Sequence, residues 1–320
     1  MMAVVRAGRH TGPVTGRFAP SPTGALHVGN LRTALAAWLI ARSAGEPFLV
    51  RMEDLDRATS SAAHEAGQLA DLAALGLDWD GDVIRQSERF DRYHEAIGEL
   101  QAAGLTYECF CTRREIREAA AAPHGPAPEG AYPGTCRHLT EAERTRRRRE
   151  RPAALRLRTE HQLVAVDDLL AGTSVGAVDD VVLRRNDGVP AYNLAVVVDD
   201  AAQGVTTVVR GDDLLETTPR QVHVQRLLGM PAVCYAHVPL VVGPGGDRLA
   251  KRDGAVTLGD LAVTGVGPPA VRAALAASLG LVAPGEEVEP AELVARFDLG
   301  TLRALGRDPV RLIDLQRSWS

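Results

Sequence analysis

The sequence predicts an α/β fold in which a parallel sheet is interrupted by an inserted subdomain and followed by a short helical region. Three observations support this. A strand, a Gly/Pro-rich turn, a helix and a second strand follow one another in residues 14–52, as in a βαβ unit. Cysteines, prolines and glycines break that rhythm over residues 106–180, and helical periodicity dominates after Pro268.

Composition sets limits on the partners of the chain. The 320 residues are 45% hydrophobic and 24% charged, which is typical of a soluble protein able to bury a sizeable core. The formal net charge is −5, so a nucleic-acid partner would have to meet a local basic patch. No stretch is typical of a membrane span or a signal peptide. We expect a cytoplasmic monomer with no membrane partner.

The first elements follow from apolar spacing. Val14–Phe18 is predicted as a short buried strand, and the residues before Thr15 as a loose leader. From Leu26 onward apolar residues recur at helical spacing until Gly45, which should end the helix. Pro47–Met52 is apolar and β-prone, which predicts the second strand.

Later elements are predicted in the same way. Helices are expected at Ser61–Leu75 and Arg89–Ala103, and strands at Tyr192–Val198, Val205–Arg210 and His237–Val242. The expected catalytic domain has two halves, residues 14–105 and 181–260. An inserted subdomain, residues 106–180, lies between them, and a helical C-terminal region, residues 261–320, follows.

The segment Pro20–Asn30 has the features of a nucleotide site. Gly24 and Gly29 allow a ligand to approach the backbone, and the start of the following helix offers amide donors to phosphate. His27 can donate to a phosphoryl group that gains charge. The alternative is a loop that only turns a strand into a helix.

An acidic segment, Arg51–Asp56, ends the second predicted strand. Its carboxylates, Glu53, Asp54 and Asp56, lie where open α/β sheets bind ligands, and one of them can hold a substrate ammonium. The alternative is a solvated acidic turn in which Asp56 caps a helix.

Two further segments carry charge at expected ligand positions. In Val208–Asp213 a strand ends in Arg210, Gly211 and Asp212. Arg210 suits a carboxylate partner, Gly211 allows a ligand to approach the backbone closely, and Asp212 can accept from ribose hydroxyls. Arg248–Arg252 is a basic stretch after a glycine-rich loop and can close over a triphosphate. An Arg-Gly-Asp sequence alone is uninformative, and its position after a strand is what favours a site. The basic stretch, taken alone, is better explained as a surface cluster.

Three of the four cysteines are clustered, in the pattern Cys-x-Cys followed by Tyr-x3-Cys. Three thiolates and a phenolate can surround one structural zinc in a tetrahedron, and the residues that would do so are Cys109, Cys111, Tyr132 and Cys136. His138 or water is the alternative fourth ligand, and clustered buried cysteines without metal are the alternative to the whole site. Cys234 is expected to be inert core.

Together these segments resemble a known family. GRFAPSPTGALHVGNLRTALAAWLIAR, RMEDLD, PAYNLAVVVDD, VVRGDDLLETTPRQ and HVPLVVGPGGDRLAKRDGA occur in the order seen in class I aminoacyl-tRNA synthetases, and they are most similar to the glutamyl branch. The resemblance runs from about Gly16 to Leu258. It implies a Rossmann-like parallel sheet and a ligase that uses ATP, with Mg²⁺, to activate glutamate.

The resemblance also implies residue roles. The glutamate-binding positions are Arg17, Phe18, Ala19, Pro20, Ser21, Glu53, Tyr192 and Arg210. The ATP-binding positions are His27, Gly29, Asn30, Gly211, Asp212, Arg248 and Lys251, of which His27 and Lys251 would be catalytic. The chain departs from the family pattern at two places: Asn30 replaces a histidine, and Arg248 with Ala250 replaces a lysine and a serine.

Within the family, the chain resembles the short paralogues called glutamyl-Q tRNA(Asp) synthetases. Only about 60 residues follow the basic loop, so we expect no anticodon-binding domain, and the cysteine pattern is similar to theirs. This resemblance implies transfer of glutamate to queuosine, the wobble base of tRNA(Asp). The alternatives are a truncated synthetase that charges the 3′ end of tRNA(Glu), and an inactive tRNA-binding paralogue.

The basic run Arg144–Arg151 is either a phosphate contact or a solvated helix face.

Overall fold

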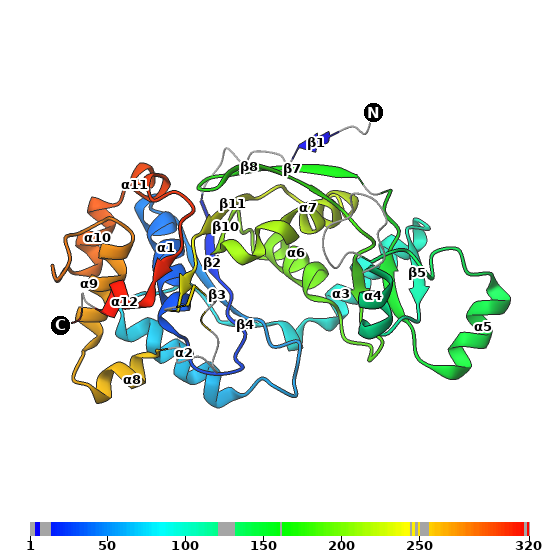
Figure 1. Cartoon of the computed structure of the whole chain (residues 1–320), viewed down its shortest axis with the longest axis horizontal. Helices are drawn as coiled ribbons and strands as arrows, with labels where there is room; N and C mark the ends of the chain where they lie inside the picture. Colours follow the sequence, from blue (N-terminus) through cyan, green and yellow to red (C-terminus); the bar gives the residue numbers. More distant parts are fainter. Residues whose placement is uncertain are drawn as a thin grey trace.

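The computed structural model describes residues 4–6, 14–120, 132–160, 162–243, 245–246, 249, 256–316 and 319. Within these residues an eight-stranded sheet forms the centre of the molecule (Figure 1). Its order is β1-β7-β11-β10-β2-β3-β4, all parallel, and β8 pairs antiparallel with β7. The bounds are β1 Val4–Arg6, β2 Gly16–Phe18, β3 Phe48–Met52, β4 Ile84–Arg85, β7 Leu163–Asp168, β8 Gly172–Ala177, β10 Thr207–Gly211 and β11 Cys234–Val238.

Helices cover both faces of this sheet. The described helices are α1 Val28–Ser43, α2 Ala62–Ala74, α3 Phe90–Ala102, α4 Arg113–Ala120, α5 Glu141–Glu150, α6 Tyr192–Ala202, α7 Thr218–Leu227, α8 Leu258–Val263, α9 Pro268–Ser278, α10 Pro290–Arg296, α11 Leu299–Ala304 and α12 Leu312–Gln316. One core packs around α1 and the C-terminal helices, and the other around α3, α6 and α7. The period-2 alternation of β10 explains the division, because Val208 belongs to one core and its neighbour Val209 to the other.

A second, smaller sheet lies at the end of the molecule opposite the C-terminal helices (Figure 1). It is antiparallel and consists of β5 Thr106–Cys109, β6 Ala154–Leu157 and β9 Val182–Arg184. Between β6 and β9 the chain returns to the large sheet to form β7 and β8. The stretch 106–180 therefore contributes strands to both sheets.

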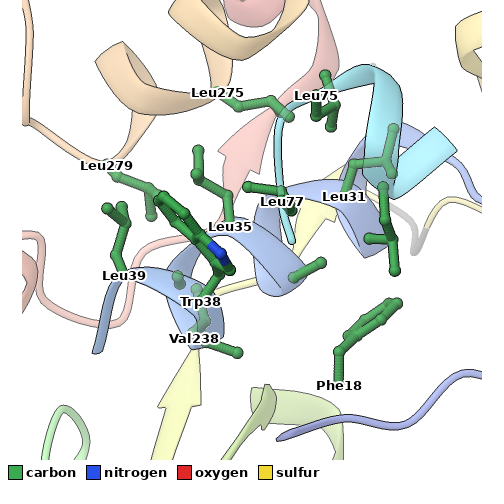
Figure 2. Close-up of a cluster of buried hydrophobic side chains, with 14 of the residues drawn as sticks. Phe18, Leu31, Leu35, Trp38, Leu39, Leu75, Leu77, Val238, Leu275 and Leu279 are labelled. Atoms are coloured by element: carbon green, nitrogen blue, oxygen red, sulfur yellow. The ribbon is translucent and has the colours of Figure 1, made fainter. Parts of the chain in front are cut away.

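Helix α1 is the central element of the first core. Its buried residues include an unbroken run from Ala34 to Ala41, so it packs on nearly every side. Figure 2 shows Leu35, Trp38 and Leu39 of α1 against Leu275 and Leu279 of the C-terminal region. At its end Gly45 has a φ of 71°, the left-handed conformation that stops a helix. The predicted stop at Gly45 is confirmed.

Three sequence-based predictions of elements were wrong. His237–Val242 was expected as one strand but is divided between the end of β11 and β12 (Val241–Val242), which belongs to another sheet. Tyr192–Val198 was expected as a strand but forms most of α6, because a short, fully buried apolar run has no periodicity that separates strand from helix. The leader was expected to be loose, yet Val4–Arg6 pairs with Leu163–Ala165 as an edge strand. That pairing is a long-range contact, which local spacing does not reveal.

The C-terminal region also contains a strand that periodicity did not predict. β13 (Val310–Arg311) pairs in parallel with β12 (Val241–Val242). Arg303 of α11 donates from Nε to the carbonyl of Leu169, at 2.8 Å. The C-terminal helices are thereby attached to the segment that leads into the basic loop.

Candidate active site

A cavity of about 670 Å³ lies at the carboxyl ends of β2 and β10. At this point of the sheet the strand order reverses. The chain continues from β2 to its neighbour β3 on one side of β2, whereas β10 and then β11 lie on the other side of β2. Open α/β sheets bind ligands at such a switch point. The lining includes most of the predicted glutamate and nucleotide positions, namely Arg17, Phe18, Ala19, Pro20, Ser21, His27, Gly29, Asn30, Glu53, Tyr192, Arg210 and Gly211.

One wall of the cavity contains buried arginines paired with acids. Arg17 donates from Nε to Asp200 (3.3 Å), and Arg51 donates to both Asp200 (2.8 Å) and Glu53 (3.3 Å). Burial would raise the pKa of Asp200, but Arg51 and Arg17 hold it below its usual range. For Glu53 burial prevails and its pKa is raised, although Arg51 and Arg17 oppose the shift. The Glu53 side chain is 10% exposed, so a carboxylate opens onto the cavity.

Arg210 also lines the cavity and is held by three directed hydrogen bonds. Its Nε donates to Nε2 of His237 (3.0 Å), and its two terminal nitrogens donate to Gln221 and Thr218 (2.7 Å each). One N–H on each terminal nitrogen remains for a ligand. The guanidinium is therefore oriented in advance for a carboxylate.

The imidazole of His27 caps α1. Its Nδ1 accepts from the backbone N–H groups of Gly29 (3.1 Å) and Asn30 (3.3 Å), while the Asn30 side chain accepts from the His27 N–H (3.2 Å). With Nδ1 as acceptor, the hydrogen-bond network assigns the ring proton to Nε2, which is then a donor. Asn30, which departs from the family motif, completes this capping box.

Described residues that flank the predicted basic loop lie near the same helix start. Leu249 lines the cavity, and the Val28 N–H donates to the carbonyl of Val256 at 2.9 Å. His27 and Thr257 form an antiparallel bridge. The predicted residues Arg248 and Lys251 lie outside the described residues. Leu249 lines the cavity, and Val256 and Thr257 contact the start of α1.

The clustered cysteines converge as the spacing predicts. The Sγ atoms of Cys109, Cys111 and Cys136 lie within 4.8 Å of one another. The Tyr132 hydroxyl is 3.3 Å from Cys109 Sγ and 3.6 Å from Cys111 Sγ. Hydrogen bonds from Cys111, Cys136 and Tyr132 lower the pKa of the Cys109 thiol. A tetrahedral zinc with sulfur ligands at about 2.3 Å separates them by about 3.8 Å, so this donor set fits the ion.

A second cavity, of about 960 Å³, extends from the first cavity to the cysteine cluster. Ser21, Glu53 and Tyr192 line both cavities, and Cys109 and Cys111 line the far side of the second one. The predicted amino-acid site is therefore shared by the cavity of the predicted nucleotide positions and by the second cavity.

The model of the catalytic domain of class I tRNA synthetases (E and Q) matches residues 13–290. The chain belongs to this family. The class I synthetase α/β fold with its mostly parallel sheet, predicted from the sequence, is confirmed. The family consists of ligases, so the expected enzyme class is confirmed as well.

Relatives of this synthetase cover nearly its whole length. A Nocardia farcinica protein named glutamyl-Q tRNA(Asp) synthetase is 60% identical over 93% of both chains. A Symbiobacterium thermophilum protein of the same name is 49% identical, over 93% of this chain and 95% of its own. The glutamate-tRNA synthetase structure from Elizabethkingia anophelis matches with a TM-score of 0.80 and 27% identity, over 96% of this chain and 70% of that one.

The synthetase structure separates the predicted residues that reach the cavity from those that do not. Among the residues of Arg51–Asp56, Glu53 lines it, whereas Asp54 accepts from Ser87 (2.8 Å and 2.5 Å) and Asp56 accepts from Ala58 (3.2 Å) in a turn. Asp212 is absent from the described lining, where its neighbour Asp213 takes a place. The ribose role predicted for Asp212 remains a prediction.

Several supporting residues were not found by sequence reasoning. Gln68 of α2 donates to the carbonyls of Ser21 (3.0 Å) and Gly24 (2.7 Å) and so fixes the loop that follows β2. Asp168 and His237 stand behind Arg210. Their only signal in the sequence is a polar residue in or directly after an apolar strand.

In the described part of the chain, no helix is long and apolar enough to cross a bilayer.

Proposed function

We propose that this synthetase activates L-glutamate with ATP and transfers the glutamyl group to queuosine in tRNA(Asp). The observation that carries the proposal is one cavity that is lined by both a buried carboxylate, Glu53, and the oriented cation Arg210. These charges complement the ammonium and a carboxylate of an amino acid. The relatives named glutamyl-Q tRNA(Asp) synthetase support the choice of acceptor.

Activation follows from positioning and charge. A glutamate carboxylate oxygen attacks the ATP α-phosphorus, a bond to the α-phosphate forms, and pyrophosphate leaves. Mg²⁺ accompanies ATP and neutralises phosphate charge when bound. His27 Nε2–H and the positive N-terminal end of the α1 dipole stabilise the charge that develops on phosphate, and Lys251 assists from the closing loop.

The second chamber is the proposed acceptor site. It adjoins the amino-acid site at Ser21, Glu53 and Tyr192, so a nucleoside hydroxyl can enter from the side opposite the nucleotide. That hydroxyl attacks the activated carbonyl, the ester forms, and AMP leaves. One structural zinc on Cys109, Cys111, Cys136 and Tyr132 would hold the far wall together.

Labelled glutamate tests the acceptor. The protein is incubated with ATP and tRNA(Asp) that carries either queuosine or guanosine at the wobble position. A third tRNA carries queuosine but lacks the 3′-terminal adenosine. We expect label on both queuosine tRNAs and none on the guanosine form. Loss of label on the tRNA that lacks the 3′-terminal adenosine would contradict the proposal and favour a truncated synthetase that charges a 3′ end. Absence of both label and glutamate-dependent ATP–pyrophosphate exchange would indicate an inactive binder.

A further inference from the structure

Helix α5 has no buried residue and projects from the small sheet at one end of the molecule (Figure 1). A short helix without a packed face needs other support, and α5 has a Thr140–Glu143 capping box and ion pairs on one side. Arg148 pairs with Glu108 (2.6 Å) and Glu141 (2.7 Å). This side of α5 is therefore attached to the body of the protein.

The other side of α5 presents unpaired cations. Ala142, Thr145, Arg146 and Arg149 follow helical spacing along one face and line a shallow groove together with Glu141. Arg146 and Arg149 are exposed and form no ion pair with any residue in the described ranges. Small side chains between two arginines leave room for an anionic chain to lie against the helix.

Helix α5 also leads to the second chamber. Arg151 directly follows it, donates to the carbonyl of Phe110 (3.2 Å) and lines that chamber together with Arg156. An acceptor nucleoside in the chamber would thus have neighbouring nucleotides near the C-terminal end of α5. The net charge of −5 makes a local basic face necessary for such a partner.

We infer that the Arg146–Arg149 face of α5 binds the sugar-phosphate backbone of the tRNA substrate, while Arg144 and Arg148 serve the structure of the helix. This inference rests on the proposed function, because it takes the partner to be a tRNA. Each phosphate neutralised on a single strand contributes about 0.7 to the slope of log binding constant against log salt. Two arginines should therefore contribute about 1.4.

The test compares two double variants of equal charge. Arg146→Gln/Arg149→Gln should weaken equilibrium binding of tRNA(Asp) about tenfold or more at low salt and reduce the salt slope by about 1.4. Arg144→Gln/Arg148→Gln should leave the slope unchanged. Glutamate-dependent ATP–pyrophosphate exchange without tRNA should be the same in both. Equal slopes for the two variants, or binding unaffected by the first, would overturn the inference. Because binding is measured without transfer, a failure of this inference can be distinguished from a failure of the proposed transfer to queuosine.

A separate observation concerns the buried groups behind Arg210. Asp168 accepts from the backbone N–H groups of Leu170 (2.9 Å) and Ala171 (2.8 Å), and its other oxygen lies 2.5 Å from Nδ1 of His237. Arg210 Nε donates to Nε2 of His237, so that nitrogen carries no proton, and burial lowers the pKa of the imidazole in agreement. Its Nδ1–H donates to Asp168, so Nε2 is the acceptor that Arg210 requires.

We infer that Asp168 and His237 are positioning residues that set substrate specificity through Arg210. A carboxylate fixed by backbone donors selects the histidine tautomer, and the tautomer selects the guanidinium orientation. If the tautomer were reversed, Nε2–H would face Arg210 Nε–H and one donor would have to move away. The cation would then no longer point both free N–H groups at a ligand carboxylate.

Glutamate-dependent exchange kinetics test this relay. His237→Leu and Asp168→Asn should each raise the KM for glutamate about tenfold or more and leave the KM for ATP within a few-fold of wild type. His237→Gln should recover most of the loss, because an amide can donate to Asp168 and accept from Arg210. His223→Leu, at another buried histidine in α7, is the control and should have no such effect. Equal changes in both KM values would show a merely structural role and overturn the inference.

Discussion

At the scale of single residues, the site depends on charges that burial makes costly. Glu53 is nearly enclosed, and its raised pKa means that its ionised form is destabilised even beside Arg51 and Arg17. Asp200 has the opposite shift because it accepts from both arginines. A carboxylate held above its usual pKa beside an open cavity is typical of a ligand site.

Glu53→Gln should stabilise the protein and impair the enzyme. Since the folded pKa is raised, the cost of ionising Glu53 is absent below the unfolded pKa of about 4.3 and grows as pH rises toward the folded pKa. Unfolding measurements should therefore show equal stability near pH 4 and a gain of about 1 kcal/mol at pH 8. The KM for glutamate in ATP–pyrophosphate exchange should rise about tenfold or more, because a charge-assisted bond is lost. A variant that is less stable at pH 8 would contradict the burial argument.

At the scale of elements, α1 contributes to both the core and the predicted nucleotide site. Its middle is buried on nearly every side, while its first turn lines the cavity and donates the Gly29 and Asn30 N–H groups to the His27 ring. Gly29 is required for close approach: a Cβ there would lie 3.0 Å from Nδ1 and Cε1 of His27 and 3.5 Å from Cβ of Val241. The same helix start thus fixes both the imidazole and the space beside it.

Gly29→Ala should raise the KM for ATP several-fold and leave the KM for glutamate unchanged, because the added methyl displaces the His27 ring and narrows the approach to the backbone. Gly98→Ala in α3 is the matched control, since nothing lies within 4 Å of its Cβ position. The control should increase the free energy of unfolding by about 0.5–1 kcal/mol and leave exchange kinetics unaltered. Similar ATP kinetics in both variants would contradict this role of Gly29.

At the scale of the molecule, the two sheets border different cavities. The large sheet borders the first cavity at its switch point, and β5 of the small sheet contributes Cys109 to the cysteine cluster at the second chamber. Arg220 of α7 pairs with Asp179, which in turn accepts from the Tyr132 N–H at 3.0 Å. The cluster is thus connected to the helix that also carries Thr218 and Gln221.

Removal of the proposed zinc should separate the two half-reactions. Metal analysis should find about one zinc per chain. A chelator, or Cys136→Ser, should lower the thermal stability and abolish transfer to tRNA, while glutamate-dependent ATP–pyrophosphate exchange persists. Absence of zinc from the purified protein would refute the metal site. Loss of exchange before loss of transfer would show instead that the small sheet supports activation.

Particular residues show how far the sequence could lead. Cys109, Cys111, Cys136 and Tyr132 converge as their spacing predicts, because a Cys-x-Cys pair and a Tyr-x3-Cys pair are each local. The run Tyr192–Val198 was misread as a strand, because its burial comes from elements far away in the chain.

The sequence by itself determined the family, the parallel sheet and most of the residues that meet at the cavity, because these depend on local motifs at strand ends. The tertiary structure alone decided which carboxylate of Arg51–Asp56 lines the cavity and that Asp168 and His237 lie behind Arg210. It also decided which arginines of α5 form ion pairs with the described residues. The reason is physical: burial, hydrogen-bond direction and ion pairing arise between residues that the fold brings together from distant parts of the chain.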